Sequence, residues 1–80
     1  MNEVSIRRIL ELLGRMNAAH ISYRIANPTE GAIMVEVSVP GERWEIEFHE
    51  DGEIGVEIFV SKGIIEGAEL LEDLFRRFGD

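Results

Sequence analysis

The sequence predicts an α+β fold, in which a four-stranded antiparallel meander has an N-terminal and a C-terminal helix packed on one face, in the order α-β-β-β-β-α. Three observations predict this class. Apolar residues recur every three or four positions near both ends of the chain, four central segments alternate apolar with polar residues, and short turn sequences separate these segments. The 80 residues have room for one hydrophobic core, so we expect residues 1–80 to form a single domain.

The N-terminal helix is expected over residues 3–17, where Asn2 suits the N-cap position. Its apolar stripe consists of Ile6, Ile9, Leu10, Leu13 and Met16. Gly14 is unfavourable inside a helix, and its presence indicates close packing against a strand. The C-terminal helix ends at Gly79 and has a wider stripe. That stripe consists of Leu70, Leu71, Leu74, Phe75 and Phe78.

The predicted strands are four alternating segments bounded by turn residues. They cover residues 21–26, 32–39, 43–49 and 54–60. Residues 61–67 are expected to connect the last strand to the C-terminal helix. One apolar sheet face and two helical stripes pack most economically when both helices cover the same face. The expected core is therefore Ile6, Ile9, Leu10, Leu13, Tyr23, Ile25, Ile33, Val35, Val37, Trp44, Ile46, Phe48, Val56, Ile58, Leu70, Leu71, Leu74 and Phe75.

Hairpin geometry predicts which side chains become neighbours on the open face of the sheet. A two-residue loop at residues 40–41 sets Glu36 opposite Glu45, and Met34 opposite Glu47. We therefore expect the second and third strands to place carboxylates side by side.

The next hairpin extends this arrangement. Only a loop with an odd number of residues keeps the apolar side chains of both strands on one face, and a three-residue loop at residues 50–52 is the common choice. This loop sets Glu45 opposite Glu57, and His49 opposite Glu53.

The first hairpin completes the face. A five-residue loop at residues 27–31 sets Ser22 beside Glu36, and Arg24 beside Met34. The expected row across the four strands is Ser22, Glu36, Glu45 and Glu57, with Glu47 one step along.

The charge of the chain is concentrated in this region. Residues 29–58 contain nine acids and one base, which is the whole net charge of −8, while the flanking segments are neutral. Such a balance argues against nucleic acid or an anionic membrane as a direct partner and favours a basic protein. Only Arg24 and Arg43 border the row, so we expect it to lack neutralising cations.

Folding alone does not require opposed carboxylates, because like charges on neighbouring strands repel each other. Two interpretations remain open: the row is a binding surface, or it is a solvated face that resists aggregation. Met34 and Phe59 lie on the same face and are residue types common at the centres of interfaces. The candidate partner-binding residues are Glu36, Glu45, Glu47, Glu57, Met34, Phe59 and His49.

The sequence offers little for catalysis or metal binding. A flat sheet has no cleft that separates the environments of two carboxylates, and no phosphate loop or nucleophile elbow is present. His49 with Glu53 and Glu47 is a weak candidate for a metal site, since the only other imidazole, His20, is distant in the chain. We expect no enzymatic activity, no cofactor and no metal.

The location predicted for the protein is the cytoplasm. The chain has no cysteine, which fits a reducing compartment. No apolar run approaches the roughly 20 residues of a membrane span, and the N-terminus does not have the pattern of a signal peptide.

The fourth predicted strand, residues 54–60, is apolar and is expected at the edge of the sheet. An open apolar edge invites pairing with another chain, so a homodimer through this strand is one hypothesis. The alternative is that residues 61–67 fold over the edge and close it.

The stretch from Trp44 to Ile54, continuing through Val56 and Glu57 to residues 60–63, resembles small acidic uncharacterised bacterial proteins. Some of these are similar to immunity proteins of polymorphic or contact-dependent toxins. The resemblance implies a non-enzymatic inhibitor that occludes a basic toxin domain. Two alternatives are a nucleic-acid mimic that inhibits a DNA-binding protein, and a homodimeric structural domain without another partner.

Overall fold

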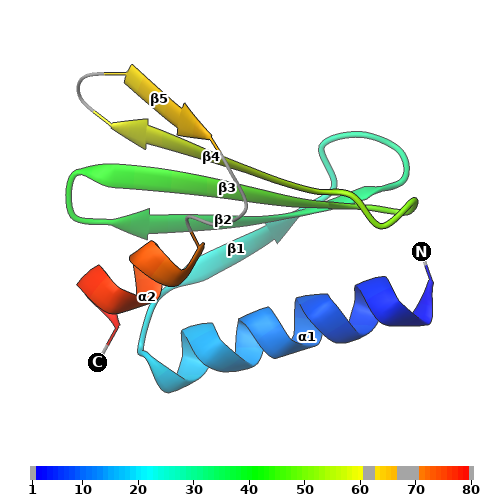
Figure 1. Cartoon of the computed structure of the whole chain (residues 1–80), viewed down its shortest axis with the longest axis horizontal. Coiled ribbons are helices and arrows are strands. Elements are labelled where there is room, and N and C mark those ends of the chain that lie inside the picture. The colour runs from blue at the N-terminus through cyan, green and yellow to red at the C-terminus, as the bar shows by residue number, and fades with distance from the viewer. Residues whose placement is uncertain (1, 61–62, 67–70, 80) are drawn as a thin grey trace.

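The computed structural model describes residues 2–60, 63–66 and 71–79 of the chain. In chain order its elements are α1 (Glu3–Ala18), β1 (Tyr23–Ala26), β2 (Ala32–Val39), β3 (Glu42–His49), β4 (Ile54–Val60), β5 (Gly63–Glu66) and α2 (Leu71–Phe78). Figure 1 shows both helices on the same side of an antiparallel sheet. The predicted α+β class, with a meander between two terminal helices, is confirmed. Within the described residues, neither helix combines the length and the apolar character needed to cross a bilayer.

The sheet has one strand more than predicted. Its order is β1-β2-β3-β4-β5, and residues 63–66 pair with residues 57–60 of β4. The alternative expectation, that residues 61–67 fold over the edge of the fourth strand, is confirmed for residues 63–66, which add a fifth strand to the predicted four. Pairing with β5 satisfies backbone groups that an open β4 edge would leave exposed. The edges are β1 and β5, so a dimer through residues 54–60 loses the open edge on which that hypothesis depended.

The core lies between the sheet and the helices. Six large side chains are completely or almost completely buried there: Met16, Val35, Val37, Trp44, Ile46 and Leu74. They come from α1, β2, β3 and α2, so the single core joins both helices to the two central strands. Burial of apolar surface on this scale is the main stabilising term of the fold.

Helix α1 presents a different side to the sheet from the one predicted. Its buried side chains are Ser5, Ile9, Leu12 and Met16. The prediction that Ile6 and Leu10 lie in the core is wrong, because they are 47% and 62% exposed. The two stripes have the same spacing of three and four residues, so periodicity cannot distinguish them, and the sheet covers only one.

The start of α1 follows the prediction. The Asn2 side-chain oxygen accepts a hydrogen bond from the backbone N–H of Ser5 at 2.8 Å, which confirms the N-cap. The prediction that Gly14 packs closely against a strand is wrong. A Cβ added to Gly14 would meet nothing within 4 Å.

Ile25 is the third error in the predicted core. It lies on β1 opposite Val35 and so faces the helices, yet it is 56% exposed because β1 is an edge strand that the helices leave uncovered. Leu70 lies outside the described residues. The other predicted core residues are either buried or packed against the buried cluster.

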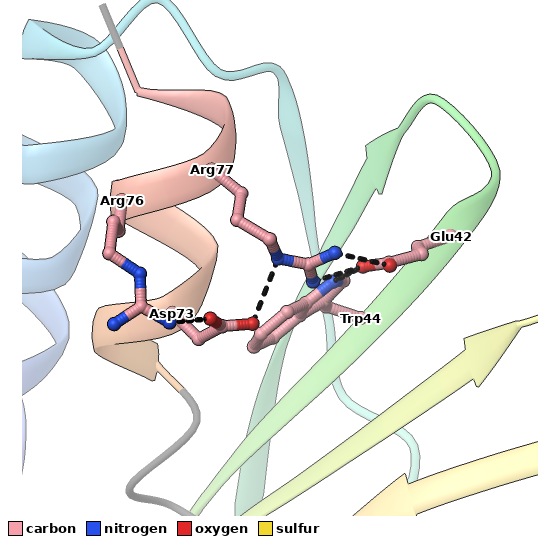
Figure 2. Close-up of polar contacts among 5 residues, drawn as sticks. All are labelled: Glu42, Trp44, Asp73, Arg76 and Arg77. Carbon is pink, nitrogen blue, oxygen red and sulfur yellow. Dashed lines mark hydrogen bonds and ion pairs between the residues drawn. The ribbon is translucent and has the colours of Figure 1, made fainter.

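A bidentate ion pair ties helix α2 to the sheet, as Figure 2 shows. Arg77 donates two hydrogen bonds of 2.8 Å to Glu42, at the start of β3. The Trp44 indole N–H donates to the same carboxylate at 2.9 Å. Arg77 also forms an ion pair with Asp73 at 2.8 Å, and Asp73 forms a second ion pair with Arg76. Glu42 thus links the buried Trp44 of β3 to Arg77 of α2.

A second bidentate pair ties α2 to α1. Arg15 donates to Glu72 at 2.7 and 2.9 Å, and its guanidinium lies 4.1 Å from the centre of the Phe75 ring. Hydrogen bonds from Arg77 and Arg15 lower the pKa of Glu42 and of Glu72, respectively, below the ordinary glutamate value. Both carboxylates are therefore ionised at neutral pH, and both pairs hold α2 in place.

Candidate functional site

The candidate site is the face of the sheet opposite the helices. The register places Glu36 opposite Glu45 and Glu45 opposite Glu57, as predicted, and we call these three residues the glutamate row. At the level of the backbone the row continues to Glu66 of β5, whose register position is opposite Glu57. Strand alternation puts every predicted partner-binding residue on this face. They are Met34, Glu36, Glu45, Glu47, His49, Glu57 and Phe59.

The predicted register of the first hairpin is wrong by two residues. Arg24 lies opposite Glu36 in place of Ser22, and Ala26 lies opposite Met34 in place of Arg24. A shift of two residues keeps every side chain on its predicted face but changes its neighbour. The row therefore begins with a cation.

Side-chain hydrogen bonds in the loop account for the shift. The Asn27 amide donates to the carbonyl oxygens of Thr29 and Ala32, at 2.7 and 2.5 Å, so the loop closes on itself before β1 and β2 begin to pair. The loop is also tied to the β3–β4 hairpin, because the backbone N–H of Glu50 donates to the carbonyl of Gly31 at 2.9 Å. This loop rises on the side of the sheet away from α1 (Figure 1).

The glutamate row is partly neutralised, which corrects the expectation that it lacks cations. Arg24 lies 3.2 Å from Glu36, and Arg43 lies 3.4 Å from Glu45. The arginines are 77% and 50% exposed, so each pair contributes less than about 1 kcal/mol. Within the described residues, no cation lies within ion-pair distance of Glu57.

The two apolar members of the site differ in accessibility. Met34 is 9% exposed, so it is not available as a contact residue, and its predicted role on the surface is wrong. Its register neighbours are Ala26 and Glu47, and a central strand leaves little room between them. Phe59 is half-buried, and the Arg43 guanidinium lies 4.5 Å from the centre of its ring.

His49 contacts a carboxylate on its own strand. Its Nε2 lies 3.2 Å from Glu47, and its backbone N–H donates to the carbonyl of Glu53 at 2.9 Å, which confirms the predicted pairing of this hairpin. In the part of the chain that the structure describes, no three His, Asp or Glu side chains are grouped so that they could hold a metal ion.

A small hollow lies at the centre of the face. Glu45, Glu47 and Glu57 surround it, and Gly55, in register with Glu47, forms its floor. Its volume of about 30 Å³ admits a water molecule or the charged end of one side chain, and it is far smaller than a pocket for an organic substrate. A Cβ added to Gly55 would meet nothing within 4 Å, so no contact inside the chain requires glycine at this position.

Sequence reasoning missed the hollow, although a signal for it was present. Glycine weakens the interior of a strand, and in an alternating pattern it often marks a place where a ligand or another chain approaches. Gly55 interrupts such a pattern between Ile54 and Val56. The pairing of Arg24 with Glu36 had no comparable signal, because it depends on the loop of the first hairpin.

Comparison of the chain with protein-family models, with curated proteins and with solved structures finds no match. The resemblance to immunity proteins therefore stays a prediction, and the case for a function rests on the face itself. That face is a sheet surface with a surplus of carboxylates and a small hollow between β3 and β4.

Proposed function

We propose that the protein is a non-enzymatic acidic binding module that occludes a basic protein partner through the glutamate row, in the manner of an immunity protein or antitoxin. The observation that carries the proposal is the hollow over Gly55, with three carboxylates around it. A lysine or arginine side chain of the partner has the charge and the width to enter this hollow. A wider cationic surface around that side chain would meet Glu36 and the remaining carboxylates.

The energetics of the free protein favour this interpretation over a purely solvated face. Glu45 and Glu57 are directly opposed, and such like-charged pairs are unfavourable by some tenths to about 1 kcal/mol. A solvated face can avoid this repulsion by alternating lysine with glutamate. A face that receives a cation gains from the same arrangement, because the partner relieves the repulsion and the desolvated pairs provide specificity.

The sheet is suited to hold these groups in place. Glu45 lies between the buried Trp44 and Ile46, whose side chains anchor β3 to the core. Glu57 lies between the buried Val56 and Ile58 on β4. The backbone positions of these glutamates are therefore set before the partner binds, so binding does not require ordering of the backbone.

The test is affinity capture from a lysate of the source cells with the immobilised protein. We expect a basic protein to be retained by the wild type and lost when Glu36, Glu45 and Glu57 are all replaced by glutamine. A matched control replaces Glu3 and Glu11 of α1 together with Glu30, which changes the net charge by the same amount at positions that do not line the hollow.

The control separates a specific surface from general acidity. Retention by the control and loss by the row variant support the proposal, and the captured protein should then lose its activity when the wild-type protein is added. Equal retention by wild type and row variant would refute the assignment of the surface. Displacement of the captured protein by free DNA would show that the partner is a nucleic-acid-binding protein and favour the mimic alternative.

A further inference from the structure

Helix α2 is anchored to the rest of the protein less firmly than α1. Four side chains of α1 are buried, whereas Leu74 is the only buried side chain of α2, and Leu71, Phe75 and Phe78 are half-buried. With 8 residues, α2 is also shorter than the roughly 12–15 residues below which an isolated helix is marginal in water. The helix therefore depends on its contacts with the sheet and with α1.

Those contacts include both bidentate ion pairs that the described residues form. Arg77 of α2 binds Glu42 of β3, and Glu72 of α2 binds Arg15 of α1, so α2 is fixed at two points. Electrostatic attraction thus acts on the element with the fewest buried side chains. The docking of α2 is therefore more sensitive to the ionic surroundings than the packing of α1 is.

Salt acts in opposite directions on α2 and on the sheet. Screening weakens the attraction in the two ion pairs of α2. The sheet is held by backbone hydrogen bonds and by apolar burial, neither of which is screened in this way. Its opposed carboxylates at Glu36, Glu45 and Glu57 repel one another, and salt relieves that repulsion. Raising the salt concentration therefore loosens α2 without loosening the sheet.

We propose that α2 is an ionic latch: screening of its two bidentate ion pairs releases the helix as a unit, while α1 and the sheet stay folded. Such partial openings occur in elements with few buried contacts, below the free energy of global unfolding. The latch is a conformational device of the fold, and it lies on the side of the sheet away from the glutamate row (Figure 1).

Release of the latch uncovers an apolar surface. Leu74 packs in the same cluster as the completely buried Trp44, whose indole N–H donates to the Glu42 carboxylate that Arg77 binds (Figure 2). When α2 leaves, the helix side of β3 loses this cover. The protein then has an acidic face that is always open and an apolar face that opens only with the latch.

Hydrogen exchange of the full chain, followed by mass spectrometry, tests the latch. The amides of residues 75–79 report on α2, since the first four N–H groups of a helix have no partner within it, and Gly79 donates to the Phe75 carbonyl at 2.9 Å. We expect their exchange to accelerate roughly tenfold between low salt and about 1 M sodium chloride, while the amides of β2 and β3 exchange no faster. The fluorescence of Trp44 should shift to longer wavelength over the same range.

A charge-matched pair of variants makes the test specific. Arg15→Gln combined with Arg77→Gln removes both bidentate pairs, and glutamine has about the helix propensity of arginine. We expect α2 of this variant to exchange rapidly at low salt and to lose its salt dependence. The control, Arg7→Gln combined with Arg8→Gln, removes the same charge from α1 at exposed positions that form no ion pair among the described residues. It should exchange as the wild type does.

Two results would overturn the proposal. One is exchange of residues 75–79 at the same rate as β2 and β3 at every salt concentration, which would show that α2 opens only with the whole domain. The other is equal exchange of α2 in the two double variants, which would show that the bidentate pairs do not control its release. Failure of the proposed binding to a basic partner would change neither measurement, because the latch does not involve the glutamate row.

Discussion

Gly55→Thr separates binding from stability at the centre of the candidate site. The substitution adds a β-branched side chain at the floor of the hollow, where an added Cβ meets no atom within 4 Å. Glycine in a strand interior is unfavourable by about 0.5–1 kcal/mol relative to alanine, and a β-branched residue is favoured further. We expect the free energy of unfolding to rise by about 1 kcal/mol, which corresponds to an increase of roughly 4–8 °C in Tm for a domain of this size.

The same substitution should weaken partner binding. The threonine side chain occupies the space that a cationic side chain needs between Glu45, Glu47 and Glu57. Loss of that one contact predicts a Kd increase of about tenfold or more. Unfolding is followed by the fluorescence of Trp44, the only tryptophan, and binding by titration with the captured partner.

Ser38→Thr is the matched control, because Ser38 is an exposed residue of the same face that does not line the hollow. It should leave the affinity for the captured partner unchanged. The reasoning is refuted if Gly55→Thr lowers stability, which would show that the backbone requires glycine there. It is refuted equally if stability rises and the partner binds as before.

Three further predictions concern the contacts between the helices and the sheet. Replacing Arg77 with methionine removes the bidentate contact with Glu42 and should lower the free energy of unfolding by about 1 kcal/mol in low salt and by less in high salt, as measured by urea titration. The folded pKa of Glu42 lies below its unfolded value, so its stabilising contribution is complete above pH of about 4.3 and is lost as pH falls through the folded pKa. Glu42→Gln should therefore flatten the acid limb of the stability profile, and an unchanged limb would contradict the assignment. Leu12→Ala should lower stability by about 2–5 kcal/mol while Leu10→Ala changes it by about 0.5 kcal/mol or less, and the reverse order would show that α1 is rotated from the position described.

Local turn chemistry explains why the two central hairpins were predicted correctly. Gly41 and Gly52 have φ values of +80° and +95°, which glycine adopts without strain, so each loop has one favoured length. Once those lengths are set, alternation places Glu36, Glu45 and Glu57 in one row.

The errors arise where a distant part of the chain decides between local alternatives. The first hairpin depends on side-chain hydrogen bonds from Asn27, which loop length alone does not reveal. In α1, two apolar stripes have equal periodicity, and only the sheet determines that Leu12 is buried and Leu10 is not. Residues 63–66 pair with β4 because that edge would otherwise be open, a requirement of tertiary structure.

The glutamate row was predicted as a pattern, but its electrostatics were not. Arg24 reaches Glu36 only because of the two-residue shift, and Arg43 reaches Glu45 along its own strand. The burial of Met34 was equally hidden, since alternation assigns a face but not the depth of a side chain within it.

Carboxyl footprinting of the protein with and without its captured partner tests the central claim most directly. A water-soluble carbodiimide labels accessible carboxylates, and mass spectrometry locates each modified residue. We expect the partner to protect Glu45, Glu47 and Glu57 from labelling while Glu3 and Glu11 on α1 react as in the free protein. Protection confined to α1, or an unchanged pattern on the sheet, would contradict the assignment of the acidic face as the binding surface.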